Sequence, residues 1–165
     1  MKQLTEPLLD ALTHEARHSP RLRANHNLHP TLDDPIQRLA IAMEPGTLIL
    51  PHRHAHTWEM LMPLRGRFVV LHFDAAGRVS HRAVLGDDCS VLETPENTLH
   101  AVLSLDTGGV IFEVKHGPYQ PLVEADFAPW ACANDPAMAA RLLTWYAGAL
   151  TGDSLPSPSG YSGFR

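Results

Sequence analysis

The chain has 165 residues, of which 44% are hydrophobic and 19% charged, with 14 prolines and 11 glycines. This length suits one domain with its own core, and the composition suits a globular protein rich in turns rather than a helical bundle or a disordered chain. The formal net charge is -5, and the 13 basic residues form no run that could follow a phosphate backbone. No apolar stretch has the length of a membrane span or the form of a secretory signal. We therefore expect a cytoplasmic protein that binds neither nucleic acid nor a membrane.

Residues 1–35 are expected to form a helix and a connection that pack on the main domain. Thr5 is a plausible N-cap, and apolar residues between Leu8 and Ala16 recur on one helical face. A helix is therefore predicted over residues 5–17, before Ser19-Pro20 ends it. The polar segment 21–35 has no clear period, and we expect it to be an ordered connection.

Residues 36–130 have the pattern of an all-β barrel. Short apolar runs are separated by Gly, Pro, Asp and Asn at intervals of roughly 8 to 12 residues. The runs are IQRLAIAM, TLILPHRH, EMLMPL, RFVVLHF, HRAVL, CSVLE, HAVLSL and VIFEVKH. Residues 74–77 and 106–109, each beginning with Asp and ending with Gly, have the composition of hairpin turns. About eight strands with no long helix among them predict a closed antiparallel barrel or jelly roll.

Residues 131–152 are expected to form a C-terminal amphipathic helix on the outside of the barrel. Asn134-Asp135-Pro136 is a helix start, and Gly152 is expected to end the helix. The apolar face consists of Ala139, Leu142, Leu143, Tyr146 and Leu150. The remaining residues, 153–165, are rich in Ser, Pro and Gly, and we expect either a flexible tail or an arm laid on a neighbouring subunit.

Histidine is the residue type that points to chemistry, because three of the 11 histidines lie within residues 52–56. On a strand, His52 and His54 project from the same face, and Glu59 begins the next predicted strand, so one hairpin would bring three ligands together. His100, which follows a turn, is the natural fourth ligand. Three imidazoles and a carboxylate suit one divalent ion such as Zn, Fe, Mn, Ni or Cu, and they leave positions open for water or substrate. The alternative is a barrel without metal.

Other polar residues are weaker candidates for substrate binding. His56 lies on the turn after the ligand pair and is either a loop residue that faces solvent or a fifth ligand. Arg38 and Tyr119 could donate hydrogen bonds to a phosphate or carboxylate. His116 could touch substrate or lie at the rim of the pocket. The two cysteines occur in no CxxC pattern, so neither a disulfide framework nor a thiolate zinc site is expected.

Two segments resemble the motifs of the cupin superfamily. Residues 46–66 match the first motif, G(X)5HXH(X)3-4E(X)6G, at every fixed position and spacing. Residues 95–100 resemble the second motif, PxGxxH, with Asn97 in place of glycine. The preceding glycine is displaced to Gly86, and Ser104 stands where an asparagine is common. Because Asn tolerates positive φ, the turn of the second motif can still form.

A narrower resemblance extends over much of the chain. The order PHRHxHxxE, VVLHFDxxG, IFEVKHGPY and FAPWA is similar to that of the WbuC-type cupin-fold metalloproteins, a bacterial family found beside genes for O-antigen and lipopolysaccharide sugars. The resemblance implies a metal-binding cupin that acts in cell-surface polysaccharide metabolism. Because cupin barrels commonly pair, it also implies a homodimer. It implies no particular reaction.

Three functions remain open from the sequence. The first is a metalloenzyme, an isomerase or hydrolase, that acts on a small polar substrate such as a sugar or sugar phosphate. The second is a non-catalytic cupin that binds a sugar in a metal-dependent way or acts in regulation. The third is an iron-dependent cupin dioxygenase. A metal-free cupin epimerase is disfavoured, because such enzymes use a His and Asp pair and this chain has the metal-ligand set instead.

Overall fold

The computed structural model describes residues 1–131 and 136–156. The helices and strands are α1 (Glu6–His18), β1 (Arg23–Asn27), β2 (Ile36–Met43), β3 (Glu59–Arg65), β4 (Phe68–Phe73), β5 (Val79–Leu85), β6 (Leu92–Thr94), β7 (Leu99–Ser104), β8 (Gly109–His116), the 3₁₀ turn η1 (Glu124–Asp126) and α2 (Pro136–Gly148). Among the described residues, neither helix has the length and hydropathy needed to cross a lipid bilayer.

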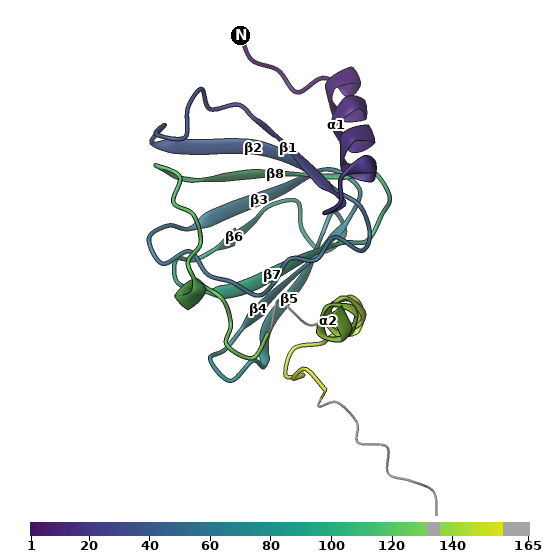
Figure 1. Ribbon diagram of the computed structural model, residues 1–165, viewed down its shortest axis with the longest axis vertical. Helices are drawn as coiled ribbons and strands as arrows, with labels where there is room; N and C mark the ends of the chain where they lie inside the picture. Colours follow the sequence, from purple (N-terminus) through teal and green to yellow (C-terminus); the bar gives the residue numbers. More distant parts are fainter. Residues whose placement is uncertain (132–135, 157–165) are drawn as a thin grey trace, which may run out of the picture.

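The strands form two antiparallel sheets that face each other (Figure 1). One sheet has the strand order β1-β2-β8-β3-β6, and the other has the order β5-β4-β7. Helix α1 lies on the outer face of the larger sheet, and α2 lies outside the smaller one (Figure 1). The all-β architecture with a helix near each end is the one that the sequence predicts.

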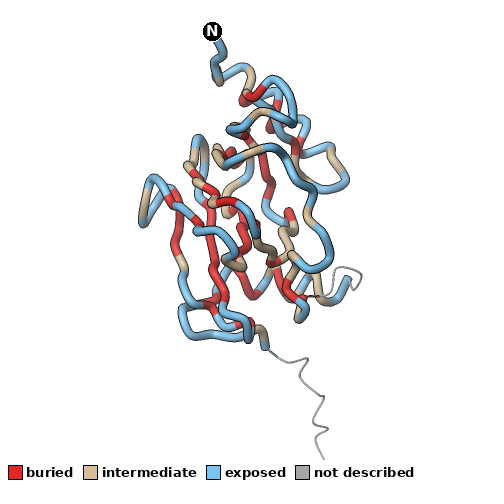
Figure 2. Tube along the Cα trace, turned by 90° about the vertical axis from the view of Figure 1, so that its left-hand side faces the viewer, coloured by how far each residue is buried: buried red, intermediate tan, exposed pale blue. Residues whose placement is uncertain are grey.

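Buried residues gather along strands in the interior, whereas exposed residues gather in the outer loops (Figure 2). Strand β4 shows how the core is layered, because all six of its residues are buried. Side chains of a strand alternate between the two faces of a sheet. Phe68 and Val70 accordingly pack in the interior with residues such as Leu61, whereas Val69 and Leu71 pack in a cluster with α2. The apolar run at residues 68–71 of β4 therefore reflects a strand that is covered on both faces.

The two predicted helices form, with adjusted ends. Helix α1 has Thr5 as its N-cap residue, although the Thr5 side chain makes no capping hydrogen bond. Helix α2 begins at Pro136 but ends at Gly148, before the predicted stop. Leu150, expected on the apolar face, is 62% exposed because it lies beyond the helix. Residues 132–135 and 157–165, which include Asn134 and Asp135 of the predicted helix start and most of the predicted tail, lie outside the described residues.

Three details of the strand prediction are wrong. The segment 21–35, expected to be a connection, contains β1, which pairs with β2 from Arg23↔Met43 to Asn27↔Leu39. The segment 47–54, which the structure describes throughout, forms no strand beyond a bridge at His52, in keeping with the missing N–H donor of Pro51. The turn at 106–109 joins β7 to β8, which lie in different sheets, so it closes no hairpin. The turn at 74–77 does join the paired strands β4 and β5.

A hydrogen bond connects α2 to the irregular segment that carries the histidines. The buried Tyr146 hydroxyl donates to the Ile49 carbonyl at 3.1 Å. We expect Tyr146→Phe to lower the free energy of unfolding by about 1 kcal/mol, because the carbonyl would lose its partner. Urea denaturation measures this change. Tyr119→Phe, at a tyrosine that is 50% exposed, is the control, and equal stability of the two variants would contradict the prediction.

Candidate metal centre

Backbone hydrogen bonds bring the two cupin-like segments together. The His52 N–H donates to the His100 carbonyl at 3.0 Å, and the His100 N–H donates to the His52 carbonyl at 2.8 Å. The Asn97 N–H donates to the His54 carbonyl at 2.8 Å. Asn97 has φ +59°, the left-handed conformation that glycine usually supplies and that Asn tolerates. The turn of the second segment thus helps to position a histidine of the first.

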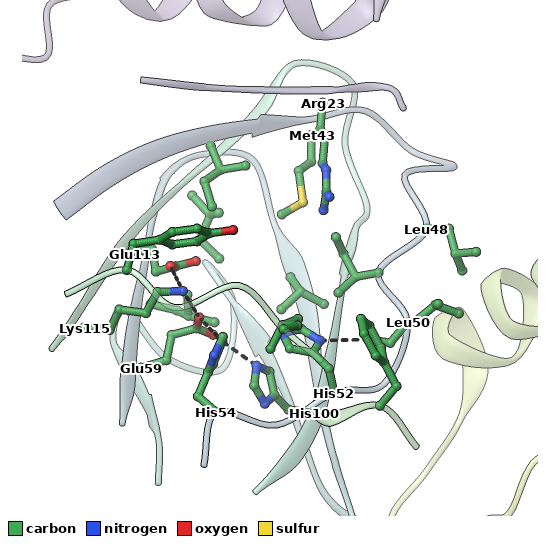
Figure 3. Close-up of a pocket in the computed structure, with 18 of the residues that line it drawn as sticks. Arg23, Met43, Leu48, Leu50, His52, His54, Glu59, His100, Glu113 and Lys115 are labelled. Carbon is green, nitrogen blue, oxygen red and sulfur yellow. Dashed lines mark hydrogen bonds and ion pairs between the residues drawn. The ribbon is translucent and has the colours of Figure 1, made fainter. Parts of the chain in front are cut away.

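The structure brings together the four residues predicted as ligands (Figure 3). One ring nitrogen from each of His52, His54 and His100 lies within 4.8 Å of the other two. The Glu59 carboxylate reaches both buried neighbours, with Oε1 3.3 Å from His54 Nε2 and Oε2 3.2 Å from His100 Nε2. His54, Glu59 and His100 are buried. The expected hairpin does not produce this arrangement, because β3 pairs with β6 and β8 rather than with the histidine segment.

In the rings of His52 and His100, a hydrogen bond at Nδ1 leaves Nε2 as the nitrogen that could bind a metal ion. His52 Nδ1 lies 2.8 Å from the Leu50 carbonyl, and His100 Nδ1 lies 2.9 Å from the Thr98 carbonyl. A carbonyl only accepts, so Nδ1 carries a proton in both rings, and in a ring that is neutral the Nε2 then has a lone pair. This is the usual way in which the ring of a metal-bound histidine is oriented.

The ionisation of the group also suits a cation. Burial lowers the pKa of His52 to about 3, so this ring is neutral at pH 7. Burial would raise the pKa of Glu59, but the adjacent His100 and His54 and the charge of Lys115 outweigh it and hold the pKa well below its usual value. Burial would lower the pKa of His100, but the adjacent Glu59 carboxylate raises it above its usual value. The site therefore combines an ionised carboxylate with the neutral ring of His52, and a metal ion would displace the Nε2 proton that Glu59 favours on His100.

Two buried nitrogen atoms test whether a metal ion fits. His54 Nε2 and His100 Nε2 have no hydrogen bond of acceptable geometry, although both are buried and face Glu59. Each nitrogen has a Glu59 oxygen within 3.3 Å, a contact that is an ion pair only if the ring is protonated, and buried nitrogen atoms without a well-formed hydrogen bond carry a cost. A divalent ion would satisfy them, because imidazole nitrogen and carboxylate oxygen are both common ligands of Zn²⁺ and related ions. The three histidines form a group that could hold a metal ion.

The candidate ligands line a cavity of about 400 Å³ between the sheets. This volume lies within the range of sites for small molecules, roughly 300 to 1,000 Å³. Much of the wall is apolar and comes from Ile41, Met43, Leu48, Ile49, Leu50, Leu61, Val102, Ile111, Leu122 and Phe127. The polar residues of the wall, besides the candidate ligands, are Arg23, Glu113, Lys115, Tyr119 and Gln120.

Glu113 and Lys115 are cavity residues that the sequence analysis did not single out. They alternate with Ile111 along β8, so all three face the interior. Lys115 Nζ lies 2.6 Å from Glu113 Oε1 and 3.5 Å from Glu59 Oε1. Burial, with a further contribution from the charge of Glu59, raises the pKa of Glu113 to about 7. Two charged residues on the inward face of an otherwise apolar strand were the signal in the sequence.

Of the weaker candidates, the structure places only Tyr119 on the cavity wall. Arg38 lies on the face of β2 opposite to the cavity-lining Ile41, where its side chain pairs with Asp34 at 3.0 Å. His56 is exposed in a turn. His116 is also exposed, on the outward face of β8, and its ring centroid lies 5.1 Å from that of Trp58. Strand alternation turns Arg38 and His116 away from the cavity.

One known protein family is similar to the first half of the chain. A family described as a domain of unknown function (DUF6016) matches residues 4–85, just under half of the chain. This match includes His52, His54 and Glu59 but ends before His100. No curated protein matches the chain.

Solved structures with a similar fold have low sequence identity to this chain. An oxalate oxidase in complex with the substrate analogue glycolate is 16% identical, with a TM-score of 0.53, and the match covers 81% of this chain and 76% of that chain. The protein TT1209 from Thermus thermophilus is 19% identical, with a TM-score of 0.52 and coverages of 70% and 97%. CapF in complex with 3-isopropenyl-tropolone is 18% identical, with a TM-score of 0.50; the match covers 59% of this chain but spans only 28% of CapF.

At these identities the likeness concerns the fold alone. The two facing antiparallel sheets, the helix near each end and the likeness to solved cupin-fold structures agree with the fold that the sequence motifs predict. The chain has the all-β cupin fold.

Proposed function

We propose that His52, His54, Glu59 and His100 bind one divalent metal ion and that the protein is a metalloenzyme for a small polar substrate, such as a sugar or sugar phosphate. The observation that carries the proposal is the convergence of three ring nitrogens, one each from His52, His54 and His100, within 4.8 Å of one another, beside the Glu59 carboxylate. When bound, a divalent ion would polarise a carbonyl or hydroxyl oxygen and lower the pKa of a bound water.

The cavity supports binding of a small molecule at this centre. The candidate ligands lie in its wall, so a substrate inside the cavity would be close to the ion. The apolar wall would exclude water, and Tyr119 and Gln120 would offer hydrogen bonds. Lys115 keeps the Glu59 carboxylate in place from a different strand, at 3.5 Å.

The resemblance to the WbuC-type proteins supports a more specific setting. We propose that the reaction belongs to cell-surface polysaccharide metabolism, that it takes place in the cytoplasm and that the protein acts as a homodimer. Size-exclusion chromatography with light scattering would test the dimer independently of the activity.

Metal analysis and activity measurements test the function. We expect purified wild-type protein to hold about one Zn, Fe, Mn or Ni ion per chain by elemental analysis. His100→Ala should lose the ion, whereas His116→Ala, at an exposed histidine, should retain it. A wild-type protein that takes up no divalent metal would overturn the proposed centre.

The activity arm separates the three functions. Protein loaded with one metal at a time is incubated with a panel of sugar phosphates, and products are followed by NMR. Turnover without oxygen consumption supports an isomerase or hydrolase, and loss of substrate that requires iron and oxygen supports a dioxygenase. Binding of a sugar without turnover under any metal would contradict the enzyme and favour the non-catalytic cupin.

A further inference from the structure

Arg23 reaches the cavity from a strand that the sequence did not reveal. It pairs with Met43 across β1 and β2. Its neighbour Ala24 packs in a cluster with α1 on the outer face of the sheet, so Arg23 faces the interior by alternation. Figure 3 shows its guanidinium pointing into the cavity beside Met43. The Arg23 side chain is half-buried and lines the cavity.

The Arg23 guanidinium makes no hydrogen bond or ion pair with any residue in the described parts of the chain, although the charge of Glu113 acts on it across the cavity. Other arginines of the protein do have carboxylate partners, namely Arg17, Arg38, Arg65 and Arg67. A partly desolvated charge without a partner is costly, and a guanidinium offers paired donors that match a carboxylate or phosphate. A ligand anion would supply the missing partner.

The charges on the cavity wall also favour an anionic ligand. Lys115 is already engaged by two carboxylates, those of Glu113 and Glu59. If Glu59, Glu113 and Lys115 carry their usual charges, their sum is one negative charge. The positive charge of Arg23 cancels it, so the described cavity wall is neutral. A divalent ion at the histidines adds two positive charges. The metal-loaded cavity would therefore attract an anion.

Arg23 and the candidate ligands lie in different parts of the same cavity (Figure 3). Met43, an apolar residue, lies beside Arg23, whereas His54, Glu59 and His100 lie beside one another (Figure 3). We infer that the cavity takes a small molecule with an oxygen donor at one end, which approaches the metal, and a carboxylate or phosphate at the other, which Arg23 binds. The inference rests on the proposed function and narrows its substrate class to anions.

Calorimetric titration with matched pairs of ligands tests this assignment. The phosphate arm compares D-fructose 6-phosphate with D-fructose, and the carboxylate arm compares D-gluconate with D-sorbitol, so each pair differs chiefly in the anionic group. The protein is wild type, Arg23→Gln, Arg23→Lys or Arg21→Gln, each with and without bound Mn²⁺ or Zn²⁺. Arg21 is exposed and lies two residues away, so its variant controls for loss of charge nearby.

We expect the wild-type protein to bind the anion at least tenfold more tightly than its neutral counterpart in one arm, which identifies the anionic group. Arg23→Gln should abolish this preference, Arg23→Lys should retain part of it because lysine keeps the charge but loses the paired donors, and Arg21→Gln should retain it. Metal content should be unchanged in all three variants, because Arg23 is not a ligand.

The outcomes separate the inference from the proposed function. A preference that persists in Arg23→Gln, or no preference in either arm, overturns the role of Arg23, even if the wild-type protein holds one ion per chain. A preference that depends on Arg23 in a protein that binds no metal supports the anion site and overturns the proposed metal centre. Should Arg23→Gln fail to fold, Arg23→Lys gives the decisive comparison, and wild-type behaviour in that variant contradicts the paired-donor contact.

Discussion

Glu59→Gln is expected to weaken binding of a divalent metal ion by roughly 100-fold or more, since even residues that only support a metal ligand contribute 10- to 100-fold. Glu59 supplies the single negative charge among the four proposed ligands, and each of its oxygens faces one histidine nitrogen. A glutamine has the same shape but no charge, and one of the two oxygens becomes an amide group that cannot bind the ion. Competition with a chromophoric chelator would measure the affinity.

Glu44→Gln is the matched control for this prediction. Glu44 is another buried glutamate, and its Oε1 accepts hydrogen bonds from Arg17 Nε at 3.0 Å and the Gly108 N–H at 3.1 Å, outside the cavity wall. Its replacement should affect stability and leave metal affinity unchanged. Wild-type metal affinity in Glu59→Gln would remove Glu59 from the proposed ligand set.

Lys115→Met is expected to lower the free energy of unfolding by about 3 to 5 kcal/mol near pH 8, the cost of breaking a buried ion pair by removing one partner. The Lys115 side chain is 16% exposed and lies between Glu59 and Glu113, whose side chains are 5% and 10% exposed. Burial would lower the pKa of Lys115, but the two carboxylates raise it above its usual value, so the lysine stays charged. Its removal leaves the buried Glu113 carboxylate without its cation and takes one positive charge away from Glu59. Chemical denaturation measures the loss.

This cost should shrink as the pH falls toward 5. The pKa of Glu113 in the folded protein is about 7, above the usual value of 4.5. The stabilisation that comes from this raised pKa is therefore fully present below pH 4.5 and is lost as pH rises through about 7. Without Lys115 the pKa of Glu113 should rise further. The variant should therefore lose most stability above pH 7, where Glu113 ionises in the wild-type protein. A penalty that is equal at pH 5 and pH 8 would contradict this account.

Two further variants test whether the loss of stability in Lys115→Met comes from the buried charges. Glu113→Gln combined with Lys115→Met removes one carboxylate together with the cation, and we expect it to recover part of the stability that Lys115→Met loses at pH 8. Lys2→Met changes the chain's other lysine, which is exposed, and should alter stability by less than about 0.5 kcal/mol. If the double variant were as unstable as Lys115→Met, unpaired charge would not be the cause.

The local sequence pattern was sufficient to predict many of the strands of this fold. Turn residues between short apolar runs indicate strands because the side chains alternate and the turns require particular backbone angles. The predicted runs at 36–43 and 67–73 accordingly match β2 and, to within one residue, β4. Strand β1 was not predicted, because its sequence RANHN is polar and its one buried side chain, Ala24, is small. The segment 47–54 was wrongly predicted to be a strand, because its apolar residues line the cavity without pairing with a neighbouring strand.

The sequence by itself determined which side chains were available as ligands and, through the spacing from Gly46 to Gly66, the fold that holds them. Tertiary structure alone decided which other side chains share their cavity. Arg23, Glu113 and Lys115 come from strands far apart in the chain, and they meet because β2 lies between β1 and β8 in one sheet. Strand order depends on long-range pairing rather than on local spacing, so the face and neighbours of a charged residue follow from the assembled sheet.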